Sequence, residues 1–273
     1  MQSLHDFMPS KRQRKRSFLQ AAGAALAAAA LPQTAHPATP VTVRVAAASD
    51  LKFALARVVK PFELETGIKV ELNFGSSGNF ARQILQGLPV DLFMSADENW
   101  AFKVADAGLS KPGATERGVV YAQGRIALLL PKRSPIRLDA DLLGLRAQWA
   151  SVRKFAIANP EHAPYGRAAQ QALTALGMWD TVQPKLVLGE NIAQASLFVT
   201  SGAAQAGISA LSLAAAPELA AVSEHIALPE RLHAPLRQRM LLLKTASPSA
   251  QQLFDYLQSA GAVALFKSAG LGL

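Results

Sequence analysis

The stretch KVELNFGSSGNFARQILQGLPVDLFMSAD (residues 69–97) decides the fold. Apolar and polar residues alternate over 69–74, which predicts a half-buried strand. The turn GSSG at 75–78 interrupts this period, and an amphipathic helix is expected directly after it. A second, apolar strand is expected over 90–94. The order of strand, glycine-bracketed turn, helix and strand is typical of a βαβ unit.

In such a unit, Ser76 and Ser77 stand at the carboxyl end of a strand and the amino end of a helix. Backbone N–H groups are unpaired there and the helix dipole is positive, so the turn can hold an anion. The alternative is that Ser77 or Asn79 only caps the helix, which is the more common role of such a residue when one turn is considered alone.

A second junction of the same kind lies nearer the N-terminus. Residues 41–45 alternate as a strand and run into AAASD at 46–50, and the apolar residues over 51–62 share one helix face. Ser49 is therefore a second hydroxyl at a strand-to-helix junction, one βα unit before Ser77. Two such junctions on neighbouring parallel strands open on the same edge of a sheet, which favours a shared binding site over two unrelated caps.

Composition narrows the class of protein. A chain of 273 residues can form one large or two medium α/β domains. Five basic residues and one aspartate before residue 20 account for +4 of the net charge of +9, so the rest offers no basic patch for nucleic acid. Cysteine is absent, which excludes disulfides, thiol catalysis, cysteine-type zinc sites and a lipoprotein anchor.

Residues 1–38 have the pattern of an export signal. A basic segment ends in KRSFL (15–19), an alanine-rich apolar stretch covers 21–31, and small residues occur near 35–38. The segment 15–19 resembles the twin-arginine motif with lysine in place of the first arginine, so the export route stays open. We expect a mature protein that starts near residues 36–40 and is soluble in the periplasm.

Two further junctions lie in the second half of the chain. The strand FAIAN (155–159) is broken by PEHAPYG (160–166), which places Tyr165 at the entry of a helix. The segment GENI (189–192) precedes another helix, and the proline-bounded stretch 229–235 is the best candidate for a linker.

The sequence lacks the motifs of the common hydrolase, nucleotide-binding and metal sites. GSSG is not the G-x-S-x-G elbow of a serine hydrolase, and no Walker lysine follows the glycines. The histidines lack the spacing of a helical metal site. What remains is hydroxyls, amides and helix ends, which bind anions without reacting with them, so an enzyme is not expected.

Five segments together resemble the periplasmic molybdate-binding proteins of ABC importers: AAASDL (46–51), FGSSGNFARQI (74–84), G-x-P-x-DLFMSAD (87–97), NPEHAPYGRAA (159–169) and GENIAQA (189–195). The resemblance implies an α/β fold of the type II periplasmic-binding-protein class, with two α/β lobes and a ligand cleft at the hinge. It places lobe 1 at 39–122 plus 236–273 and lobe 2 at 123–235.

The resemblance also implies the site. Ser49 and Ser77 match the two serines that hold the oxyanion from the first lobe, Tyr165 matches a contact from the second lobe, and Ile192 matches a backbone N–H donor. Ala210 stands where one branch of the family has a tyrosine ligand, and Tyr165 is expected to replace it. These residues would hold molybdenum only as its oxyanion, and no cofactor is expected.

Asp50 is the remaining candidate, at a place that is often uncharged in relatives. We expect its carboxylate to point outward at the first turn of a helix, where the dipole favours an acid. None of the matched positions is Lys or Arg, so the site is expected to select a fully deprotonated tetrahedral dianion with neutral donors alone. Such a site has nothing to accept the proton of a protonated oxyanion such as phosphate.

The function implied by the resemblance is an exported receptor that captures molybdate or tungstate and delivers it to an ABC permease in the inner membrane. We expect a monomer that binds no nucleic acid. One alternative is the same fold serving sulfate or another oxyanion. The other is the effector domain of a transcription regulator, which would carry an N-terminal helix-turn-helix where this chain has an export signal.

Overall fold

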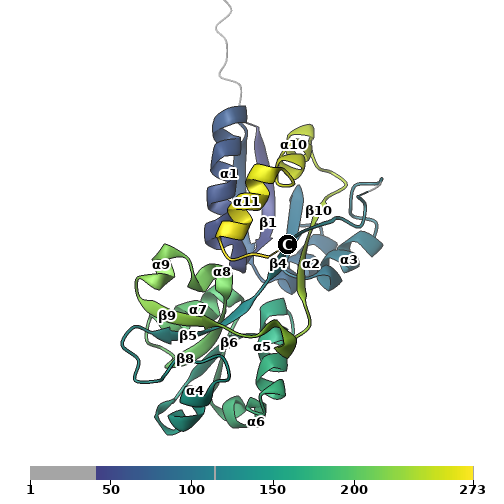
Figure 1. The fold of residues 1–273 in the computed structure, drawn as a ribbon. Helices are drawn as coiled ribbons and strands as arrows, with labels where there is room; N and C mark the ends of the chain where they lie inside the picture. The colour runs from purple at the N-terminus through teal and green to yellow at the C-terminus, as the bar shows by residue number, and fades with distance from the viewer. Residues whose placement is uncertain (1–40, 114, 273) are drawn as a thin grey trace, which may run out of the picture. The chain divides into compact units, whose positions relative to one another are not determined.

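The computed structural model describes residues 41–113 and 115–272, and the predicted export signal (1–38) lies outside the described residues. These residues form two five-stranded mixed sheets with helices on their faces (Figure 1). The first sheet has the order β2-β1-β3-β10-β4, and its strands are β1 (Thr42–Ala48), β2 (Lys69–Gly75), β3 (Leu92–Ser95), β4 (Val119–Gly124) and β10 (Leu236–Leu242). The second has the order β7-β6-β8-β5-β9, with β5 (Ile126–Pro131), β6 (Phe155–Ala158), β7 (Leu186–Gly189), β8 (Ala206–Ala210) and β9 (Ser223–Ala227).

The first sheet confirms the two neighbouring junctions. β1 pairs with β2 and with β3 in parallel, and Ala48 at the end of β1 lies opposite Gly75 at the end of β2. Ser49 and Ser76 therefore follow adjacent strands at the same edge. β10 runs antiparallel between β3 and β4 and joins them into one sheet.

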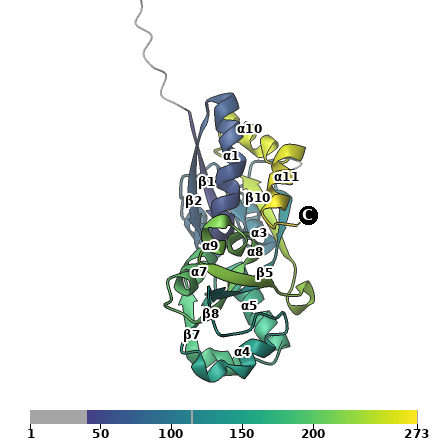
Figure 2. The same cartoon turned by 60° about the vertical axis from the view of Figure 1, so that its left-hand side comes forward.

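Helices cover both faces of the first sheet. α1 (Lys52–Thr66), α10 (Pro248–Tyr256) and α11 (Ala260–Ser268) pack on one face (Figure 2). There Leu55, Phe254 and Phe266 share a core with Val45 of β1. α2 (Ser77–Leu85) and α3 (Glu98–Asp106) pack on the other face, around Phe93. Alternation along β1 thus places apolar side chains in two separate cores.

The second sheet is built in the same way. α5 (Pro164–Ala175) packs on one face, together with the short helices α4 (Leu143–Ala147) and α6 (Trp179–Val182). On the other face lie α7 (Ile192–Thr200) and the short helix α8 (Leu211–Ala214), and α9 (Pro217–Ala220) leads into β9. None of the helices in residues 41–113 and 115–272 has the length and apolar character that a membrane crossing needs.

The chain passes between the sheets twice. It leaves the first sheet at Gly124 and enters the second at Ile126, then returns between Ala227 and Leu236. The return contains a short 3-10 turn, Glu230–Leu232, inside the stretch predicted as a linker. We call each sheet with its helices a lobe. We predicted that two bodies, divided at 122/123 and 235/236, move separately. This division stays a prediction.

Candidate functional site

A small cavity lies between the lobes, where the first turns of several helices meet. Residues 48–50, 75–77, 163–165 and 191–192 line it, together with Ala96. Three of these segments are the starts of α2, α5 and α7, and the fourth is the 3-10 turn Ser49–Leu51 that leads into α1. The space open to the centre of a water-sized molecule is about 10 Å³. No Lys or Arg lines the cavity, so helix ends and neutral donors provide its positive potential.

The hydroxyl groups of Ser49 and Ser77 do not cap their own helices. No side-chain cap hydrogen bond exists at the start of the 3-10 turn, α1 or α2. Instead the Oγ of Ser77 accepts a hydrogen bond from the N–H of Ala96 at 2.9 Å, and the Oγ of Ser49 accepts one from the N–H of Ala193 at 3.2 Å. Both side chains are buried. A hydroxyl that accepts in this way keeps its own proton for a ligand.

Ser76 has a different role from Ser77, although the sequence places the two side by side. Its Oγ donates to the carbonyl oxygen of His162 at 2.8 Å and lies 2.8 Å from the ring Nδ1 of the same residue. The N–H of Gly78 also donates to this carbonyl, at 3.0 Å. Because its proton is already used, Ser76 joins the two lobes and leaves ligand donation to Ser77.

Ile192 is the first residue of α7 and lines the cavity. The side chain of Asn191 caps this helix by accepting from the N–H of Gln194 at 3.1 Å. Since the first N–H groups of a helix have no carbonyl partner within it, the N–H of Ile192 is a donor that α7 itself leaves unused.

The expectation that Asp50 points outward is wrong. Asp50 is 1% exposed, and its Oδ2 accepts from the phenol of Tyr165 at 3.0 Å and from the Nε2 of Gln238 at 2.6 Å. Its other oxygen, Oδ1, is buried and has no hydrogen-bond partner among the described residues. The dipole argument failed because it considered one helix alone. The second lobe covers this turn, and Ser212 donates to the Asp50 carbonyl at 2.9 Å.

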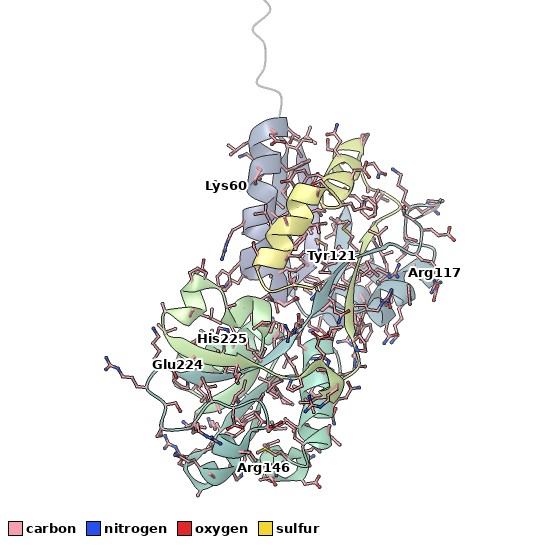
Figure 3. All side chains as sticks on the ribbon, viewed as in Figure 1. Lys60, Arg117, Tyr121, Arg146, Glu224 and His225 are labelled. Carbon is pink, nitrogen blue, oxygen red and sulfur yellow. The ribbon has the colours of Figure 1, made fainter. Side chains whose placement is uncertain are left out.

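Tyr165 lines the cavity, but its hydroxyl proton points to Asp50. Its oxygen also accepts from Gln238 Nε2 at 3.0 Å. The hydroxyl of Tyr121 in turn donates to Gln238 Oε1 at 2.8 Å, which fixes the amide so that its NH₂ faces Asp50 and Tyr165. Tyr121, labelled in Figure 3, belongs to the first lobe, and its ring packs against Phe266 of α11 with 5.7 Å between centroids. A direct contact between Tyr165 and a ligand stays a prediction.

Burial controls the charges of this cluster. It raises the pKa of Asp50 from 3.8 to about 6, although hydrogen bonds from Gln238 and Tyr165 act in the opposite direction. Burial, followed by the nearby Asp50 carboxyl, raises the pKa of Tyr165 and of Tyr121 well above 10. Both phenols are therefore protonated donors at neutral pH.

Gln238 was not identified by sequence analysis. It is fully buried in β10 between two arginines, and it is 188 residues from Asp50 in the chain. The alternation of β10 could have shown that Gln238 faces inward, but not which group it meets there.

Further contacts hold the lobes together around the cavity. Asn79 Nδ2 donates to Glu190 Oε1 at 2.5 Å, and Arg167 of the second lobe forms an ion pair with Asp97 of the first. Within the part of the chain that the structure describes, no group of three or more His, Cys, Asp or Glu side chains could hold a metal ion. The donor set suits an anion that accepts hydrogen bonds.

Comparison with known proteins gives a consistent result. Residues 43–272 match the family described as bacterial extracellular solute-binding protein. The chain is 35% identical over 235 residues to the molybdate-binding protein ModA of Azotobacter vinelandii, which covers 85% of this chain and 90% of that protein. It is 33% identical to the molybdate-binding protein ModA of Rhodobacter capsulatus, over 86% of this chain and 90% of that one.

Solved structures agree in fold. The Azotobacter vinelandii periplasmic molybdate-binding protein matches with a TM-score of 0.74 and 32% identity, over 85% of this chain and 99% of that chain. The sulfate-binding protein SubI of Mycobacterium tuberculosis matches with a TM-score of 0.69 at 15% identity, over 85% of this chain and 86% of that one, a likeness of fold alone. The chain therefore belongs to the bacterial extracellular solute-binding protein family, together with the ModA proteins.

Proposed function

We propose that this chain is the substrate-binding protein of an ABC importer and that it captures molybdate, or tungstate, in the cavity between its lobes. The observation that carries this proposal is the state of two hydroxyls. Ser49 and Ser77 each accept a backbone N–H and keep a proton to donate, beside the free N–H of Ile192 at the start of α7. The relatives named as molybdate-binding proteins support this choice of anion.

A tetrahedral dianion fits this environment for two reasons. Its oxygens accept hydrogen bonds from hydroxyl and backbone donors, and its charge is favoured at the starts of α2, α5 and α7. The residues would hold the oxygens of the anion, so no protein atom would coordinate molybdenum itself, and no catalytic group or cofactor is needed.

Delivery and location complete the proposal. The extracellular description of the family supports export of the chain. We propose in addition that the chain loses a signal within residues 1–38 and passes its anion, as a monomer, to a permease of the inner membrane. Sequencing the N-terminus of the exported protein tests the processing step, with a start near residues 36–40 expected. A protein that keeps residue 1 in the cytoplasmic fraction would contradict it.

Calorimetry with sodium molybdate, tungstate, sulfate and phosphate tests the binding step. We expect tight one-to-one binding of molybdate and tungstate and much weaker binding of sulfate, which is smaller. The variant Ser77→Ala, which lacks one proposed donor, should bind molybdate more weakly than the unmutated protein. If the protein prefers sulfate over molybdate, its ligand is another oxyanion. If it binds none of the four anions, the proposal is refuted.

A further inference from the structure

The two oxygens of the buried Asp50 carboxyl are in different environments. Oδ2 accepts two hydrogen bonds, from Tyr165 and from Gln238, whereas Oδ1 is buried with no partner among the described residues. This asymmetry fits a neutral carboxylic acid, because its carbonyl oxygen accepts two bonds while its other oxygen carries a proton to donate. An ionised carboxylate would instead leave a charged oxygen buried and unpaired.

The position of Asp50 gives that proton a use. Asp50 lines the same small cavity as Ser49 and Ser77, whose hydroxyl protons are also free. When a residue that lines an anion-binding cavity has a buried, unpaired oxygen, this oxygen can donate to the anion if it is protonated and repels the anion if it is not.

No charged side chain of the described residues contributes to the shift in the pKa of Asp50. The groups near the carboxyl are uncharged at neutral pH: Tyr121 of β4, Tyr165 of α5 and Gln238 of β10. Ser212 of α8, also uncharged, bonds to the backbone carbonyl of the same residue. The charge state of this carboxyl is therefore decided by burial, by its hydrogen bonds with Gln238 and Tyr165, and by the occupant of the cavity.

We infer that Asp50 binds the oxyanion as a neutral acid and donates its Oδ1 proton to an anion oxygen, so that capture of a dianion takes up one proton from solvent. This inference rests on the proposed function and adds a specificity-determining residue to its site. The proton comes from water as the anion enters and returns to water when the anion leaves. Without it, a carboxylate would lie beside a dianion in a buried site, where the repulsion is strong.

The inference predicts how affinity depends on pH. With a pKa of about 6, half of the free protein carries the proton at pH 6. At pH 8 this falls to about one hundredth, and the apparent Kd rises as the competent fraction falls, roughly fifty-fold over this range. Molybdate carries no proton near neutral pH, so the ligand itself does not produce this dependence.

The variant Asp50→Asn distinguishes uptake of a proton by residue 50 from donation of a hydrogen bond by this residue. The amide can place its carbonyl toward Tyr165 and Gln238 and its NH₂ where Oδ1 lies, which makes it a permanent donor. We expect affinity for molybdate that is nearly independent of pH, similar to the unmutated protein at pH 6 and tighter than it at pH 8. Asp50→Ala has no donor at this place and should bind more weakly than Asp50→Asn at every pH.

The decisive measurement is proton uptake, by calorimetry with micromolar sodium molybdate in buffers of different ionisation enthalpy at pH 6 and pH 8. For the unmutated protein we expect about one half of a proton per anion at pH 6 and about one at pH 8. Asp50→Asn should show none. Asp97→Asn is the matched control, because Asp97 is also buried with a raised pKa but does not line the cavity. It should retain the uptake, even if loss of its ion pair changes affinity.

The outcomes are distinguishable. Molybdate binding without proton uptake by the unmutated protein, or uptake that persists in Asp50→Asn, would overturn the inference and leave the proposed function intact. If the unmutated protein does not bind molybdate at all, both are overturned. The uptake of the unmutated protein decides the question even if Asp50→Asn fails to fold.

Discussion

Replacing Ser77 with alanine removes a hydroxyl that has one partner in the structure and one proposed partner, the anion. In the structure its Oγ accepts from the N–H of Ala96 at 2.9 Å, and its proton is free for the anion. Loss of a hydrogen bond to a charged ligand weakens binding by about 1.5–3 kcal/mol, or roughly tenfold to a hundredfold in Kd. The same change leaves the Ala96 N–H without its acceptor, which lowers the free energy of unfolding by about 1–3 kcal/mol.

The assay combines calorimetry with molybdate and urea denaturation of the ligand-free protein. Ser49→Ala should behave like Ser77→Ala, because its hydroxyl also accepts one backbone N–H, from Ala193, and keeps its proton. Ser76→Ala is the control in the same turn. Its proton goes to the His162 carbonyl, so its loss should change affinity only through a weaker contact between lobes.

The comparison among the three serine variants distinguishes hydroxyls that bind the anion from hydroxyls that only stabilise the fold. Large losses of affinity at Ser49 and Ser77 with a small loss at Ser76 support two ligand donors. Equal and small losses of affinity at all three, with only the unfolding free energy reduced, would show that these hydroxyls have structural roles and that the anion is held elsewhere.

Three other outcomes can be measured. Burial raises the pKa of Asp50 from 3.8 to about 6, so the native state holds the proton more tightly and the unfolding free energy should fall as pH rises through this range, then level off. The fall is at most about 3 kcal/mol and should vanish in Asp50→Asn, as urea denaturation at several pH values would reveal. Gly124→Ala would place a Cβ 2.3 Å from the Tyr165 hydroxyl, so we expect a lower Tm and weaker molybdate binding, whereas Gly261→Ala, with no atom within 4 Å, should lower neither. Small-angle scattering should detect closure of the lobes at saturating molybdate, and unchanged dimensions would count against a hinge.

Local patterns in the sequence were sufficient to locate the junctions. Alternation before residue 49 and before residue 75 identified two parallel strands, and their register brings Ser49 and the GSSG turn to one edge. The starts of α5 and α7 followed from chain breaks at prolines and glycine. The helix over 260–268 was not predicted, because only two of its residues, Ala262 and Phe266, are buried, which is too few to define a helical period.

The site was predicted less completely than the fold. Residues at the start of their own helix, such as Ser77 and Ile192, could be located from the local sequence, and both line the cavity, while their contact with an anion stays a prediction. Asp50 was misjudged because its environment is supplied by α5, α8 and β10. No pattern within one element reports which groups from other elements bury it, and the same holds for Gln238, whose partners are Tyr121, Tyr165 and Asp50.

The place of β10 in the first sheet has a consequence for the order of events during synthesis. This strand lies between β3 and β4, yet it is made only after the whole second lobe. A nascent chain that has reached residue 235 can complete the second sheet, while β3 still has an unpaired edge and β4 has no neighbour in its sheet. The strands of the first lobe within 42–124 must therefore wait for β10, and unpaired edges of this kind are sites of aggregation. A ribosome stalled shortly before β10 should present a chain that chaperones bind and proteases cut within 42–124, while 126–227 already resists cleavage.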